Sequence, residues 1–234
     1  MLFFYSQDTR AAGTGRLDGS GDFVHLKDFP AGQFGRWTHI VPGGGQLFFY
    51  SKDTRAAGTG RLDAGGDFVN LKDFPAGQFG DWTHVLFAGG DLLARFFFYS
   101  RSTRAAGSGE LDDGGGFNNL VDFPAGQFGD WSHVVFDGGA SKLFFYSQST
   151  RAAGTGRLDA GGDFVHLKGF PAGQFGNWSH IVPTSRRLFF YDRQTRAAAS
   201  GELDGNGDFI NLVDFPAGQF GNWTHIGATQ DGLP

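Results

Sequence analysis

One unit of sequence recurs five times along the chain. Each copy contains a single Trp and a single Tyr, and the tryptophans are spaced 45, 49, 47 and 45 residues apart. The tyrosines, at positions 5, 50, 99, 146 and 191, follow the same spacings. The heptapeptide F-P-A-G-Q-F-G is identical in every copy. A period of this length, with several short apolar segments per copy, is typical of the blades of a β-propeller.

Each copy is expected to form four short strands, as the first one illustrates. Residues 2–5 (L-F-F-Y) are a continuous apolar run, as in a strand buried on both faces. Residues 11–17 follow a polar turn, and D-G-S-G at 18–21 indicates a hairpin. Residues 23–29 alternate between apolar and polar side chains, and residues 37–41 (W-T-H-I-V) supply the fourth strand. The crossover P-A-G-Q-F-G joins the last two.

The sequence therefore predicts an all-β fold: a five-bladed β-propeller of four-stranded antiparallel blades, forming a single domain over residues 1–234. The repeats span about 1–46, 47–95, 96–142, 143–187 and 188–234. W-T-H-I is expected to form a hairpin with the L-F-F-Y that follows it. The last W-T-H-I, at 223–226, has no such successor. We expect it to pair with residues 2–5, so that the N- and C-terminal strands close the propeller.

The composition excludes several other classes of protein. The chain contains 40 Gly in 234 residues, which disfavours long helices, and 16% aromatic residues, which disfavours disorder. A net charge of −5 without a basic run argues against nucleic-acid binding. Cysteine is absent, so disulfides and thiolate chemistry are excluded. No segment resembles a signal peptide or a membrane span, so a soluble monomer without membrane insertion is expected, either secreted or cytoplasmic.

The strand order resembles that of a known lectin family. An inner strand, an aromatic strand, a short strand, an outer strand and a Gly-rich crossover ending in an aromatic residue are similar to the repeats of tachylectin-like five-bladed propeller lectins, and to tectonin-type bacterial propeller lectins. This chain has Asp22-Phe23 where that family has Asn-Trp, and Gln33-Phe34 within its crossover where the family has Gly-Gly-Trp. The resemblance implies carbohydrate binding in pockets between neighbouring blades, often for N-acetylated sugars such as GlcNAc.

Two residue types near the crossover are candidates for contacting a sugar. The first is the Trp, whose indole can stack its flat face on a pyranose. The alternative is a structural role, in which the indole packs between blades as a core aromatic. The second is the Gln four residues earlier, whose amide can donate to and accept from sugar hydroxyls. The alternative is that this amide forms hydrogen bonds with backbone groups of the crossover. The candidates are Trp37, Trp82, Trp131, Trp178, Trp223, Gln33, Gln78, Gln127, Gln174 and Gln219.

An arginine follows the apolar strand in every copy and is the third candidate. Its planar donor fork suits pairs of hydroxyls, while a salt bridge to the equivalents of Asp18 or Asp28 is the alternative. These residues are Arg10, Arg55, Arg104, Arg151 and Arg196.

Two repeated features suggest metal sites but are better explained structurally. A histidine two residues after each Trp could form a ring, yet five-fold His coordination matches no common metal geometry, so hydrogen-bonded structural histidines are expected. The L-D-x-x-G-D-F turn carries too few recurring carboxylates for calcium, which favours a hairpin turn. We therefore expect neither a metal nor a cofactor.

The repetition itself points to a function. No catalytic set of residues breaks the repeat, so the chain is not expected to be an enzyme. Several weak equivalent sites gain apparent affinity by engaging one surface together. The sequence therefore predicts a multivalent lectin with up to five equivalent pockets that binds glycans. The alternative is a structural or protein-interaction propeller without a sugar ligand, which includes a designed or recently amplified repeat.

Overall fold

The computed structural model describes residues 1–89, 94–184 and 186–226. The chain separates into two compact units, one made of residues 1–85 with 111–118 and the other of residues 86–110 with 119–234. The last eight residues of the predicted fifth repeat lie outside the described residues. No helix in the part of the chain that is described is long and apolar enough to cross a membrane. The assignment of the whole chain to a single domain stays a prediction.

The described residues form nineteen strands and no helix, and they build the five sheets of a five-bladed β-propeller, as predicted. The strands that begin at the repeated histidine are β4 (His39–Gly43), β8 (His84–Phe87), β12 (His133–Asp137) and β16 (His180–Pro183). The aromatic strands are β1 (Leu2–Ser6), β5 (Gln46–Ser51), β9 (Ala94–Ser100), β13 (Lys142–Ser147) and β17 (Leu188–Asp192).

Two further strands complete each blade. The short strands are β2 (Ala11–Leu17), β6 (Ala56–Leu62), β10 (Ala105–Leu111), β14 (Ala152–Leu158) and β18 (Ala197–Leu203). The outer strands are β3 (Phe23–Phe29), β7 (Phe68–Phe74), β11 (Phe117–Phe123), β15 (Phe164–Phe170) and β19 (Phe209–Phe215).

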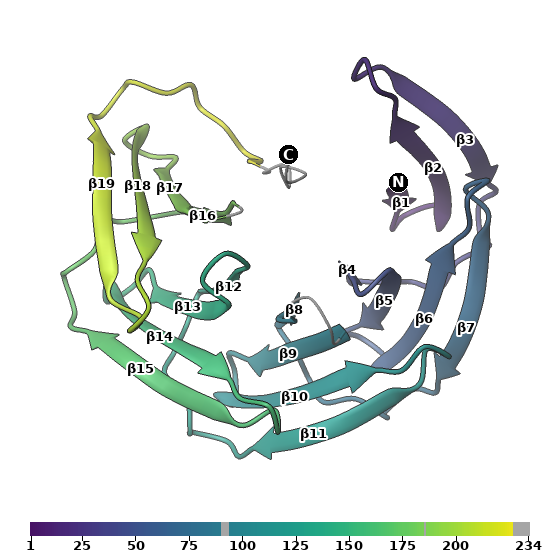
Figure 1. Cartoon of the computed structure of the whole chain (residues 1–234), viewed down its shortest axis with the longest axis horizontal. Coiled ribbons are helices and arrows are strands. Elements are labelled where there is room, and N and C mark those ends of the chain that lie inside the picture. Colours follow the sequence, from purple (N-terminus) through teal and green to yellow (C-terminus); the bar gives the residue numbers. More distant parts are fainter. Residues whose placement is uncertain (90–93, 185, 227–234) are drawn as a thin grey trace. The chain divides into compact units, whose positions relative to one another are not determined.

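Each four-stranded blade takes its inner strand from one repeat and its other three strands from the next. The sheet order β12-β13-β14-β15 is an example, and Figure 1 shows its strands side by side. His133 pairs with Tyr146 in the antiparallel ladder between β12 and β13. The predicted hairpin between W-T-H-I and L-F-F-Y is therefore confirmed. The inner strand begins at the histidine, two residues later than predicted, because the Trp belongs to the crossover.

The first sheet departs from this pattern. It consists of β1, β2 and β3 only, and residues 223–226 form no strand, so the predicted closing pair is not found among the described residues. Phe4 in β1 is consequently 49% exposed, whereas Phe49 at the same position in β5 is 2% exposed. The inner strands of the other blades pair with the segment that follows them directly.

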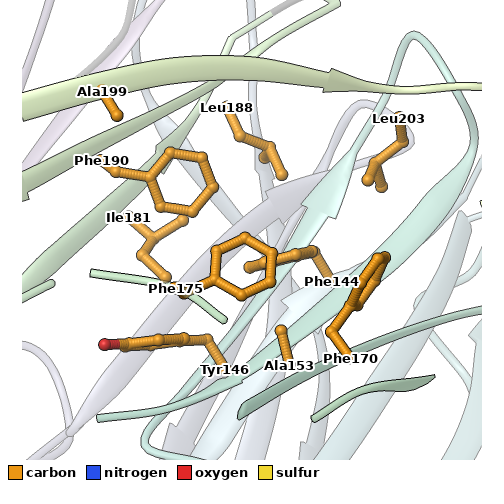
Figure 2. Packing of buried hydrophobic residues seen from close by; sticks show 10 residues of the cluster. All are labelled: Phe144, Tyr146, Ala153, Phe170, Phe175, Ile181, Leu188, Phe190, Ala199 and Leu203. Carbon is orange, nitrogen blue, oxygen red and sulfur yellow. The ribbon is translucent and has the colours of Figure 1, made fainter. Parts of the chain in front are cut away.

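Aromatic side chains from neighbouring sheets fill the core. In the second unit, Figure 2 shows Phe175 from a crossover among Phe144, Phe190 and Ile181. The Phe144 and Phe175 rings meet edge to face with centroids 5.6 Å apart. Complete burial of such a side chain contributes about 2–3 kcal/mol. Strand β13 is thus buried on both faces, because Phe144 contacts Phe190 of β17 on one side and Phe145 contacts Phe97 of β9 on the other.

Buried hydroxyls also tie each sheet to the next. Thr155 Oγ1 donates to the carbonyl oxygen of Gly207 at 2.7 Å, and Ser108 Oγ does the same to Gly162 at 2.7 Å. In the first unit Thr59 donates to the Gly115 carbonyl at 2.8 Å. These bonds anchor the hairpin turn of one repeat on the short strand of the preceding one, which fixes the spacing between sheets.

Candidate functional site

The invariant crossover folds into a fixed loop with its Phe inward. In the fourth repeat the N–H of Gly173, at φ 82°, donates to the Thr150 carbonyl, and the N–H of Phe175 donates to the carbonyl of Arg151. These bonds hold Phe175 in the core, while Gln174 between them is exposed. The conserved shape of the loop therefore presents the Gln amide outward in each repeat.

A tyrosine hydroxyl fixes the Trp that ends each crossover. Tyr146 Oη donates to the Gly176 carbonyl at 2.6 Å and accepts from the backbone N–H of Trp178 at 3.0 Å. All five repeats make this pair of bonds, in which the hydroxyl donates to the glycine carbonyl and accepts from the tryptophan N–H. The residues are Tyr5 with Gly35 and Trp37, Tyr50 with Gly80 and Trp82, Tyr99 with Gly129 and Trp131, Tyr146 with Gly176 and Trp178, and Tyr191 with Gly221 and Trp223. Burial raises the pKa of Tyr50, Tyr99 and Tyr146, which keeps the donating proton in place.

The indole folds back over the glycine that precedes it by two positions. A Cβ added to Gly129 would lie 2.8 Å from ring atoms of Trp131, so only glycine allows this approach. The other neighbour of the indole is Phe145 in β13, whose centroid lies 5.9 Å away at an interplanar angle of 47°. The Trp is half-buried, between the crossover and the aromatic strand of the next repeat.

Pockets open beside three of these tryptophans, each within one unit. Their volumes are 380, 380 and 360 Å³. The first is lined by Gln33, Phe34, Gly35, Trp37, Phe49, Gly58, Phe68, Asn70 and Asp73. The second is lined by Gln127, Phe128, Gly129, Trp131, Phe145, Ala153, Gly154, Thr155, Phe164, His166 and Gly169. The third is lined by Gln174, Phe175, Gly176, Trp178, Phe190, Ala199, Phe209, Asn211 and Asp214.

The structure thus brings the predicted Trp and Gln together at one wall of each pocket. This holds for Trp37 with Gln33, for Trp131 with Gln127 and for Trp178 with Gln174. The remaining candidates, Trp82, Gln78, Trp223 and Gln219, hold the same positions in their own crossovers, and Trp223 is 55% exposed. Whether these side chains bind a ligand stays a prediction.

The five arginines lie elsewhere. Each adopts a left-handed backbone conformation, with φ between 57° and 61°, in the turn after the aromatic strand. In that turn the backbone N–H of Arg151 donates to the Ser147 carbonyl. The Arg151 carbonyl accepts a hydrogen bond from the backbone N–H of Phe175. None of the five lines the three pockets, and none makes an ion pair in the described ranges, so the alternative of a salt bridge to the equivalents of Asp18 or Asp28 is wrong. The backbone of this residue shapes the turn and holds the crossover.

The repeated histidines are hydrogen-bonded structural residues, as expected. His133 Nδ1 shares a bond of 2.9 Å with the Ser132 hydroxyl, and Nε2 meets the Ser179 carbonyl of the next repeat at 3.1 Å. Burial lowers the pKa of His133 and of His39, against the opposing effect of the backbone hydrogen bond each makes. The rings of His133 and His39 therefore each link their own inner strand to the residue that precedes the next one.

The Asp-rich hairpins satisfy their own backbone. Asp63 Oδ1 accepts from the N–H groups of Gly65 and Asp67, both at 2.9 Å. This is the geometry of a self-capped turn, which supports the hairpin interpretation. Within the described ranges, no group of three or more His, Cys, Asp or Glu side chains is arranged to hold a metal ion.

Sequence reasoning missed the polar wall opposite the Trp. In the first pocket Asn70 Nδ2 donates to Asp73 Oδ2 at 3.1 Å, and in the third Asn211 donates to Asp214 at 2.9 Å. His166 occupies the corresponding position in the second pocket. The available signal was a polar residue, His or Asn, at one position of every outer strand. The alternating pattern marked it as a solvated face but could not show that a crossover covers part of that face.

Comparisons with known proteins support the fold. No protein-family model matches the chain, and no curated protein is similar to it in sequence. Among solved structures it resembles a putative 6-phosphogluconolactonase from Bacteroides uniformis, with TM-score 0.62, 14% identity, and coverage of 96% of this chain and 74% of that one. A putative 6-phosphogluconolactonase from Bacteroides fragilis gives TM-score 0.59 and 11% identity, covering 88% of this chain and 65% of that one.

A third similar structure is the periplasmic gluconolactonase PpgL of Pseudomonas aeruginosa, with TM-score 0.59 and 13% identity, covering 92% of this chain and 66% of that one. This chain therefore spans just under two thirds of the length of two of these structures. At such identities the likeness shows the fold alone.

These neighbours correct one expectation. The repetition of the sequence predicts that the chain is not an enzyme, yet the three similar structures are named as gluconolactonases or putative 6-phosphogluconolactonases, which are enzymes. The reasoning fails because a propeller with repeated blades can still carry a catalytic site in one place, through differences among the repeats. The resemblance to tachylectin-like lectins rests on the repeat itself and stays a prediction beyond the shared propeller fold.

Proposed function

We propose that the chain is a multivalent carbohydrate-binding protein in which each pocket beside a crossover Trp holds one sugar. The observation that carries this proposal is the recurrence of one pocket, with nearly the same volume and the same Trp, Gln and Phe wall, in three repeats. A volume of 360–380 Å³ lies near the lower end of the range for small-molecule sites and suits a monosaccharide.

The wall chemistry matches the surface of a pyranose. The Trp178 indole offers a flat apolar face for the C–H side of the ring. The Gln174 amide both donates and accepts, and the Asp214 carboxylate accepts from hydroxyls. Carboxylate acceptors bind hydroxyl donors more strongly than neutral acceptors do. The pockets of Trp37 and Trp178 thus combine an apolar platform with a Gln and an Asp, and the pocket of Trp131 combines it with Gln127 and His166. Two polar groups are the minimum for orienting a sugar.

The repetition supplies the affinity that one small pocket lacks. Sites of millimolar affinity gain apparent affinity of about 10²-fold or more when several engage one surface. Glycan-coated surfaces display many copies of one sugar, so equivalent pockets suit them.

A glycan array tests the proposal. A triple variant, Trp37→Ala with Trp131→Ala and Trp178→Ala, is expected to lose the glycans that the unchanged protein binds. The matched control is Leu17→Ala, which removes an apolar side chain that is 57% exposed and lies outside the pockets. Absence of any bound glycan, or binding that the triple variant retains, would contradict the proposal.

Hydrolysis of a sugar lactone is a second candidate function. The names of three neighbouring structures suggest it, and the carboxylates of Asp73 and Asp214 each line a pocket, where one could accept a proton from attacking water. The test is titration of acid released from 6-phosphogluconolactone. Release above the spontaneous rate, abolished by Asp73→Asn with Asp214→Asn, would favour the enzyme, whereas the spontaneous rate alone would reject it.

A further inference from the structure

The three pockets differ at a single charged position. Asp73 and Asp214 each place a carboxylate in the wall opposite Trp, and the equivalent residue in the pocket beside Trp131 is Gly169. That pocket has no carboxylate or other acidic side chain in its lining. Besides Gln127, its polar side chain is His166, because the Thr155 hydroxyl is buried and donates to the Gly207 carbonyl.

The carboxylate of the acidic pockets is directed toward the short strand. Asp73 lies opposite Gly58 in the ladder between β6 and β7, and its Oδ1 is 3.5 Å from where a Cβ on Gly58 would be. A Cβ on Gly58 would also lie 3.7 Å from the Trp37 indole. The Asp73 oxygen and the indole therefore border the same space, in which a bound sugar would lie.

We propose that the Trp131 pocket accepts sugars bearing a carboxylate, and that the pockets of Trp37 and Trp178 select neutral sugars. This inference rests on the proposed function. A ligand carboxylate a few Å from Asp73 or Asp214 meets a like charge at a distance shorter than the Debye length, so the two charges repel each other. In the Trp131 pocket it meets the imidazole of His166, whose N–H can donate to it.

The chain itself shows that residue 169 can carry the charge. A Cβ on Gly169 would have only His166 ring atoms near it, at 3.9–4.0 Å, and its φ is not in the left-handed region. In the first repeat the corresponding pair exists, with His25 Nε2 3.0 Å from Asp28 Oδ1. Gly169→Asp therefore recreates a pairing that the fold already accommodates, and Gly169→Asn supplies the same shape without the charge.

Site-resolved NMR tests the inference. Protein labelled with 5-fluorotryptophan gives one ¹⁹F signal per repeat, assigned by single Trp→Phe variants. The probes are GlcNAc, its C6 uronic acid, and N-acetylmuramic acid, which carries its carboxylate on another side of the ring. We expect the Trp131 signal to report binding of at least one acid at least about fivefold tighter than at Trp37 and Trp178, and GlcNAc to show no such preference.

The variants separate charge from shape. Gly169→Asp is expected to abolish the preference for the acid at Trp131, Gly169→Asn to retain it, and Asp214→Gly to create it at Trp178. Equal response of the three signals to the neutral and acidic probes would overturn the inference and leave the proposed function standing. No response of any signal to any probe would overturn both for this class of sugar.

Discussion

The hydroxyl of Tyr146 donates a 2.6 Å hydrogen bond to the carbonyl oxygen of Gly176, thirty residues further along the chain. The hydroxyl oxygen of Tyr146 in turn accepts a hydrogen bond from the backbone N–H of Trp178. The position of the indole beside the pocket therefore depends on a side chain from the buried aromatic strand. This arrangement recurs in every repeat and links the core of each blade to its candidate site.

Removing this hydroxyl should destabilise the fold. Tyr146→Phe leaves the Gly176 carbonyl and the Trp178 N–H without their partner, and we expect a loss of about 1–3 kcal/mol in the free energy of unfolding. Urea denaturation measures it. Tyr5→Phe removes the same two bonds in a more exposed setting, where water can replace the hydroxyl, so its cost should be smaller. Equal costs for the two variants would argue against this account of burial.

The glycine under each indole should not tolerate a side chain. In Gly129→Ala the new Cβ would come within 2.8 Å of the Trp131 ring, so the indole must move away from the pocket wall. We expect a changed near-UV circular dichroism signal and loss of any ligand response at Trp131. Gly138→Ala is the control, because nothing lies within 4 Å of its added Cβ. An unchanged aromatic signal in Gly129→Ala would show that the indole does not need this contact.

The arginine turns store backbone strain. Arg151 has φ 57°, a conformation that glycine adopts freely and other residues adopt at a cost. Arg151→Gly should therefore be more stable than Arg151→Ala by about 0.5–1 kcal/mol, although both lose the same side chain. The same pair of substitutions at Arg157, in strand β14, should show the reverse order. Thermal unfolding of the four variants distinguishes these orders, and a more stable Ala variant at 151 would contradict the strain.

The buried histidines should make stability depend on pH. Burial lowers the pKa of His133 below its ordinary 6.5, so the unfolded chain binds a proton at a higher pH than the folded chain does. The stability that His133 contributes is complete above about pH 6.5 and is lost as the pH falls through its lowered folded value. Urea denaturation between about pH 5 and 8 should show a shallower fall for His133→Gln than for the unchanged protein. Parallel curves would contradict this.

Much of the fold could be predicted from the repeat. The identical spacing of Trp and Tyr predicted the blades. The apolar L-F-F-Y run predicted strands buried on both faces, as β13 is at Phe144 on one face and Phe145 on the other. The first sheet has only β1, β2 and β3 among the described residues, and no local pattern in the repeat showed that residues 223–226 would form no strand.

The site could be predicted in part. Trp131 and Gln127 were recognisable because crossover residues of both types recur, and they do share a pocket wall. Asp73 could not be placed there, since alternation along a strand tells which residues share a face but not what covers it. Ligand binding by the arginines stays a prediction. The left-handed backbone of their turns could not be predicted, because it carries no sequence signal when the residue is not glycine.

The central claim is that equivalent pockets each bind a sugar. Isothermal titration calorimetry of the unchanged protein, with a neutral sugar identified on the array, measures the number of sites per chain directly. The account predicts at least three sugars per chain, one for each pocket beside Trp37, Trp131 and Trp178. A single site per chain, or no heat of binding with any array hit, would contradict it.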